Sequence, residues 1–202
     1  MARNIGGVVA DFDDVWRSRR GDLEPIGHLL RYRAGDTWVR FHTLPGAKRF
    51  PRNDAERRTV FSRHRAVLSE LCSVTATSPQ DLRVMTSGWS SSPEPAGRST
   101  RLVAAFGESA YWRSLLVDDD TDHQWWQHIY IGTSTLGSPR LRALLRLVAD
   151  DRAGDVVITS TGAEWLYHPY DGGGDVIAPT QAIRDGLRDK FFRWLPPNAE
   201  GL

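Results

Sequence analysis

The chain has 202 residues, a formal net charge of +1, 40% hydrophobic residues and one cysteine, Cys72. A chain of this length buries about 70% of its extended surface, so it forms a core without disulfides, and the lone cysteine excludes an internal one. No apolar run approaches the roughly 18 residues of a membrane span, and the first residues lack the pattern of a secretory leader. We therefore expect a single cytoplasmic domain over 1–202, with a variable segment at about 1–12.

The first predicted element is a short helix over Asp11–Arg20. Its acidic start and arginine-rich end complement a helix dipole, and its apolar residues have helical spacing. The Asp11-x-Asp13 pair also resembles the nucleophile signature of haloacid-dehalogenase-type phosphatases. Such an enzyme needs a parallel α/β domain after the motif, whereas 28–33 and 37–43 flank a short loop, the pattern of a β-hairpin. We therefore interpret the aspartates as the start of a helix.

The rest of the chain predicts separate helices and paired strands. Asn53 and Glu56 fit a capping box that opens an amphipathic helix, which should end near Ser73. The serine-, proline- and glycine-rich stretch 88–100 predicts a long surface loop. The other expected elements are strands at 81–85, 101–106, 111–117, 125–131 and 175–178, a hairpin of 155–160 with 163–168, and helices from Ser138 and Thr180. This order predicts an α+β fold with a largely antiparallel sheet and about three to four packed helices.

Several residues invite a metal or nucleophile interpretation, and each has a simpler structural one. The acidic stretch 118–123 lacks the glycine and glutamate of a helix-loop-helix calcium site. His123 and His128 have poor geometry for zinc if a strand begins at 125. His64 and Cys72 lie on the apolar stripe of a predicted helix, where we expect them to be buried. We predict no metal site and no cofactor.

Residues 40–65 form a strongly basic sector, with eight basic and two acidic side chains and a net charge of +6. Such a sector attracts phosphates or an acidic protein surface. Nucleic acid is a possible partner, but no recognised nucleic-acid motif supports it. We expect Arg40, Lys48 and Arg49 to hold an anionic ligand or partner, with His42 beside them.

A second candidate block runs from Trp165 to Asp175 and contains three consecutive glycines. His168, Asp171 and Asp175 are side chains that can move protons, Tyr170 can bind a ligand, and the glycines permit close backbone approach. A tight hairpin turn needs aspartate and glycine for purely structural reasons. Both interpretations stay open.

The two candidate blocks belong to a set of four familiar stretches, namely Trp38–Pro51, Trp89–Pro95, Tyr111–Arg113 and Trp165–Ile177. Together they resemble an uncharacterised actinobacterial family and, more distantly, a wider bacterial domain of unknown function, over about residue 13 to the C-terminus. The resemblance implies a single compact domain and brings no established reaction, cofactor or partner. The chain departs from it at Gly174, where alanine is expected, and at Phe50, where tyrosine is often expected.

Two functions follow from these observations. The first is a soluble, intracellular, non-catalytic binding or accessory protein, of an immunity-like kind, that presents an arginine- and tryptophan-rich surface to a protein or anionic partner. Its candidate binding residues are Arg40, Lys48, Arg49, Tyr170 and Trp89. The second is a small enzyme acting on an anionic or phosphate-bearing substrate, with acid–base groups His168, His42, Asp171 and Asp175. If the protein is an enzyme, these groups should surround one concave pocket. If it is a binding protein, its binding residues should form a broad exposed patch.

Overall fold

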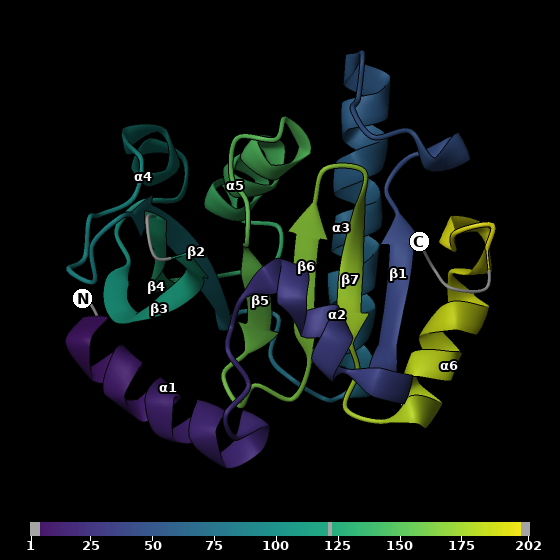
Figure 1. Ribbon diagram of the computed structural model, residues 1–202. Helices are drawn as coiled ribbons and strands as arrows, with labels where there is room; N and C mark the ends of the chain where they lie inside the picture. Colours follow the sequence, from purple (N-terminus) through teal and green to yellow (C-terminus); the bar gives the residue numbers. More distant parts are fainter. Residues whose placement is uncertain (1–4, 121–122, 199–202) are drawn as a thin grey trace.

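An antiparallel sheet forms the centre of the computed structural model, which describes residues 5–120 and 123–198 (Figure 1). Within this part of the chain the sheet has seven strands in the order β1-β7-β6-β5-β2-β4-β3. The strands are β1 (Trp38–His42), β2 (Leu82–Ser90), β3 (Ala110–Asp120), β4 (His123–Ser134), β5 (Val157–Ser160), β6 (Leu166–Tyr170) and β7 (Gly173–Ile177). The predicted α+β class, with a single compact domain around one antiparallel sheet, is confirmed.

Helices cover both faces of the sheet (Figure 1). One face carries α1 (Ile5–Arg20) and α2 (Leu30–Arg33), and the other carries α3 (Asp54–Val74), α4 (Thr100–Phe106), α5 (Pro139–Ala149) and α6 (Gln181–Lys190). Short 3-10 segments lie at Gly27–Leu29, Gly35–Thr37, Pro45–Ala47 and Phe192–Trp194. None of the helices described is both long and apolar enough to cross a bilayer.

A hydrophobic core lies on each face of the sheet. Leu68 of α3 and Leu144 of α5 pack with Val84 of β2 in the larger core. Trp16 of α1 packs with Met85 of β2 in the other. Since Val84 and Met85 are neighbours in one strand, their side chains point to opposite faces, which explains why the central strands are apolar on both sides.

Two segments that were expected to be strands are helical, so the described chain has six α-helices rather than three to four. Residues 101–106 belong to α4, because the Ser99 side chain accepts a hydrogen bond from Leu102 N at 3.2 Å and caps the helix. Leu102 and Phe106 are buried whereas Ala104 between them is exposed, which is a helical period, because a strand would place all three on one face. The stretch 28–33 forms a 3-10 turn and α2, so the hairpin predicted with 37–43 is wrong.

The partner of β1 is β7, from the far end of the chain. Arg40 lies opposite Asp175, and Asp175 lies opposite His168 of β6 on its other side. These three side chains therefore form one row on the face that α2 covers, while Val39 and Phe41 point into the larger core. This pairing brings the two candidate blocks of the sequence together.

The remaining predicted elements are present with different boundaries. Helix α1 begins at Ile5 rather than Asp11, so the aspartates lie inside it, and Asp13 forms an ion pair with Arg113 of β3. Strand β2 extends to Ser90 and shortens the predicted loop 88–100. Strands β3 and β4 take up most of the acidic stretch 118–123, and residues 121–122 lie outside the described residues.

Candidate functional site

A cavity of about 430 Å³ lies on the α2 face of the sheet, over β6, β7 and β1. Its wall is built from four segments that are far apart in sequence: the turn and helix at 28–33, β1, the loop after β1, and the β6–β7 hairpin. We call it the arginine pocket. Its described lining residues are His28, Leu29, Arg31, Tyr32, Arg40, Arg49, His168, Tyr170, Asp171 and Asp175.

Arg40 and Asp175 form a two-bond ion pair in the pocket. Arg40 Nε donates to Asp175 Oδ1 at 2.7 Å, and Nη2 donates to Oδ2 at 2.9 Å. Burial acts to lower the pKa of Arg40, but the hydrogen bonds and charge of Asp175 outweigh it and raise that pKa, so Arg40 is a permanent cation. Because only 4% of the Asp175 side chain is exposed, removal of Arg40 would leave a buried carboxylate unpaired.

Arg49 and Arg31 supply the other cations of the pocket. Arg49 is largely exposed, and its Nε donates to the Asp171 carboxylate. Arg31 forms no ion pair within the described residues, and its guanidinium lies 4.5 Å from the ring centroid of Tyr32. Its Nη2 donates to the Tyr32 hydroxyl, whereas its Nε is buried and makes no hydrogen bond to any residue described. Arg31 is therefore the pocket cation with the most unused capacity for an anion.

His168 lines the pocket with its imidazole in a defined state. Its Nδ1 lies 2.8 Å from the Val156 carbonyl oxygen, which only accepts, so Nδ1 carries the proton and Nε2 is an acceptor. Burial lowers the pKa of His168, against the opposing pull of the Asp155 and Asp175 carboxylates, so the ring is neutral near pH 7. A Cβ at Gly27 would come within 2.5 Å of the His168 ring, so glycine lets the turn before α2 cover it.

Tyr170 adds a hydrogen-bond donor to the pocket. Burial raises its pKa, and the Asp175 carboxylate raises it further, so the phenol stays protonated. Its hydroxyl is buried beside the Arg40 guanidinium, and it donates no hydrogen bond within residues 5–120 and 123–198. A Cβ at Gly173 would come within 2.5 Å of that hydroxyl, so the glycine of the turn makes room for the phenol.

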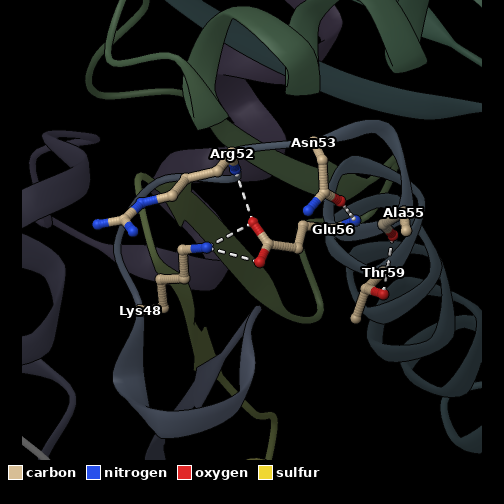
Figure 2. A network of polar contacts seen from close by, with 6 residues as sticks. All are labelled: Lys48, Arg52, Asn53, Ala55, Glu56 and Thr59. Carbon is tan, nitrogen blue, oxygen red and sulfur yellow. Dashed lines mark hydrogen bonds and ion pairs between the residues drawn. The ribbon is translucent and has the colours of Figure 1, made fainter.

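Lys48 lies outside the lining of the arginine pocket, at the start of α3. Figure 2 shows its ammonium beside the carboxylate of Glu56, with Nζ 2.6 Å from both oxygens. Glu56 also accepts from the Arg52 backbone N–H at 2.6 Å, and its own N–H donates to Asn53 Oδ1 at 2.9 Å. The predicted cap by Asn53 is present, and Lys48 neutralises the carboxylate beside it.

His42 and Trp89 also lie outside the described lining. His42 is at the end of β1, and burial together with Arg40 and Arg63 lowers its pKa. Trp89 is 40% exposed in β2, which β5 separates from β6. Of the sequence candidates, the fold brings together Arg40, Arg49, His168, Tyr170, Asp171 and Asp175.

Sequence analysis missed three polar members of the pocket, namely His28, Arg31 and Tyr32. It assigned 28–33 to a strand, where alternate side chains would point to opposite faces. The adjacent Leu29 and Leu30 are compatible with a short helical turn, which is the one local signal that was available. Only the packing of α2 over β7 places these side chains beside His168 and Tyr170.

The fold and the pocket define a small α+β protein with a cationic cavity at one edge of an antiparallel sheet. The chain belongs to the family described as domain of unknown function (DUF3885), whose model matches residues 26–198. Every residue that lines the arginine pocket falls within the matched range. No curated protein and no solved structure matches the chain.

Proposed function

We propose that this chain is a non-catalytic, cytoplasmic binding protein whose arginine pocket holds a small ligand with a carboxylate or phosphate group. The observation that carries the proposal is the convergence of Arg31, Arg40 and Arg49 on one cavity of about 430 Å³. Two aspartates offset part of this charge, so the described lining keeps a positive balance with both ion pairs formed. A cavity of this volume suits a small molecule better than a macromolecular surface.

Each unsatisfied group of the pocket has a role in this proposal. The fork of the Arg31 guanidinium matches the spacing of two oxygens on a carboxylate or phosphate. The Tyr170 hydroxyl donates to the same anion, which relieves the cost of leaving a buried donor without a partner. His168 Nε2 accepts from a hydroxyl or amine elsewhere on the ligand.

Titration of inorganic phosphate and of succinate, followed by calorimetry and by amide chemical shifts, tests the proposal. We expect Arg31→Gln to weaken binding by about tenfold or more, because a charged hydrogen bond is lost. Tyr170→Phe should weaken it by a smaller factor. Arg33→Gln is the matched control, since Arg33 is an exposed α2 arginine outside the described lining. Failure of both probes to bind, or equal binding by the Arg31→Gln protein, would overturn the proposal.

A second candidate function, acid–base catalysis on a phosphate-bearing substrate, is favoured by the neutral state of His168 and by the concave pocket that an enzyme requires. His42, the other expected acid–base histidine, lies outside the described lining of that pocket. A neutral imidazole with its proton fixed on Nδ1 presents Nε2 as a general base. His168→Asn keeps a donor for the Val156 carbonyl and removes the base. If the protein is an enzyme, it turns over p-nitrophenyl phosphate, and this variant loses turnover while it still binds phosphate. If wild type does not turn over p-nitrophenyl phosphate, or if the His168→Asn variant is as active as wild type, the catalytic hypothesis is rejected and binding is left as the function.

A further inference from the structure

A second concave surface lies between α3 and α5, on the side of the sheet opposite the arginine pocket. It consists of two adjoining cavities of about 710 and 310 Å³, which share Arg58, Phe61 and Arg142 in their walls. We call it the α3–α5 groove. Its floor is apolar, and the buried or half-buried side chains that form it include Phe61, Leu68, Ala105, Leu141, Leu145 and Leu147.

The rim of the α3–α5 groove is lined with arginines from both helices and with one exposed aspartate, Asp54, at the start of α3. Arg57 is neutralised by Asp150, with Nη1 2.5 Å from Oδ1. The other four arginines are exposed and form no ion pair within the part of the chain that the structure describes. They are Arg58 and Arg65 of α3 and Arg142 and Arg146 of α5.

The free arginines of the rim repel one another. Arg142 and Arg146 are four residues apart on α5, a spacing at which like charges destabilise a helix. Arg142 reaches from α5 towards α3, and its guanidinium lies 5.6 Å from the ring centroid of Phe61. The groove therefore presents cations directly above an aromatic floor, and carboxylates placed along its rim would relieve their mutual repulsion.

We propose that the α3–α5 groove binds an acidic amphipathic helix of a partner protein. The apolar face of such a helix packs on Phe61 and the leucines of the floor, and its carboxylates pair with the four free arginines of the rim. The proposal does not depend on the arginine pocket, because the two sites share no described lining residue and lie on opposite faces of the sheet.

The shape and charge of the groove favour this occupant over other polyanions. A flat lipid surface does not reach a recessed apolar floor. Single-stranded nucleic acid binds on exposed aromatic rings, whereas Phe61 is half-buried beside Arg142, and the whole chain carries only +1. A symmetric dimer formed through the groove would bring two identical sets of arginines together, and these would repel each other.

The test uses a synthetic acidic peptide of about four helical turns, with leucines at i, i+3, i+4 and i+7 and glutamates elsewhere. A scrambled peptide of the same composition is the control for charge alone. We expect the ordered peptide to bind the full chain in a fluorescence polarisation titration, with affinity falling as salt rises. Arg58→Glu and Arg142→Glu should each weaken binding by about tenfold or more. The matched charge control is Arg188→Glu, an exposed α6 arginine outside the described groove lining.

A neutral substitution separates occupancy of the groove from attraction by charge. Ala143 is a half-buried α5 residue in the wall, and Ala143→Gln fills the groove while it keeps a good helix former and all arginines. Ser69→Gln, at an exposed α3 position outside the described lining, is its control. The proposal predicts that Ala143→Gln binds the ordered peptide more weakly than wild type does, and that Ser69→Gln binds it with the affinity of wild type.

Five results would overturn the proposal. The first is that the ordered peptide fails to bind wild type. The second is that it binds the Arg142→Glu and Ala143→Gln variants as tightly as it binds wild type. The scrambled peptide binds as tightly as the ordered one, which would mean that charge alone acts. A single-stranded oligonucleotide binds more tightly than the peptide and loses affinity in Arg142→Glu, which would assign the groove to nucleic acid. Sedimentation shows a dimer that Arg142→Glu dissociates, which would assign it to a second copy.

Discussion

The histidine at position 64 shows how one buried side chain shapes the response of the protein to pH. His64 lies on the core side of α3, fully buried as its place on the apolar stripe predicted. Its Nδ1 is 2.6 Å from the Tyr167 hydroxyl, and its Nε2 has no partner within the described residues. Burial lowers the pKa of His64 to about 3, so the residue is neutral in the folded protein.

We predict that His64 makes the folded protein less stable in mild acid. The unfolded chain takes up a proton at this histidine below about pH 6.5, whereas the folded chain does so only near pH 3. Stability that is present above pH 6.5 is therefore lost as the pH falls towards 3, by about 2 kcal/mol at pH 5. Urea unfolding at pH 7 and pH 5 measures this loss.

The variant His64→Gln should reduce the difference in unfolding free energy between pH 7 and pH 5 by about the same 2 kcal/mol. Ser69→Gln, at an exposed and non-titrating position of the same helix, is the control and should leave the difference close to that of wild type. A His64→Gln protein that loses as much stability at pH 5 as wild type does would contradict the prediction.

At the scale of elements, a glycine in β7 gives the side chain of Tyr167 room to lie across that strand. Tyr167 of β6 is buried and extends over β7, and a Cβ at Gly174 would come within 2.6 Å of its Cζ. The hydrogen bond to His64 holds the phenol in place, so the ring has no free direction in which to move. The alanine that the family resemblance implies at this position would therefore require a different position of Tyr167.

The substitutions Gly174→Ala and Gly186→Ala should change stability in opposite directions. At Gly174 the added methyl group overpacks the core and should cost about 1–3 kcal/mol. At Gly186 in α6 a Cβ meets nothing within 4 Å, so alanine should stabilise the helix by about 0.5–1 kcal/mol. Urea unfolding of both variants against wild type measures the two effects. Two shifts of the same sign would be inconsistent with this packing.

At the scale of the whole molecule, the sheet interleaves the two halves of the chain. Strands β1 and β2 come from the first half, but β7, β6 and β5 from the second half lie between them. The stretch 88–100, the strongest break in composition, therefore does not separate two folding units. The core that contains Val39 and Val84 also requires Val176 and Ile158.

We accordingly predict that neither half folds alone. A fragment of residues 1–98 contains β1 and β2, which are not neighbours in the sheet and so cannot pair with each other. It should therefore give the narrow amide dispersion of an unfolded chain in a heteronuclear NMR spectrum. The fragment of residues 99–202 should behave likewise, because it lacks α3 and the edge strand that pairs with β7. The intact chain is the control, and a dispersed spectrum from either fragment by itself would disprove the prediction.

The positions of α3, α5 and α6 and the fold class could be predicted from the residues alone, since the signals for them are local. The Asn53 cap and the apolar stripe of α3 lie within one segment, as do the Ser138 cap and Pro139 of α5. The strand predicted over 101–106 is wrong, and Ser99, which caps α4, is the local signal for a helix there. Both blocks of candidate residues were also identified from the sequence, because unusual residue types cluster within each.

Tertiary structure alone decided which candidates form a site. The sequence offers Arg40, Lys48 and Arg49 as equivalent cations, yet Arg40 pairs with Asp175, 135 residues away, while Lys48 turns to Glu56 in its own vicinity. It contains no sign that Arg31 would face the same cavity. The physical reason is that caps and periodic faces depend on neighbours along the chain, whereas strand partners and ion pairs depend on which distant segments bury their apolar sides against each other.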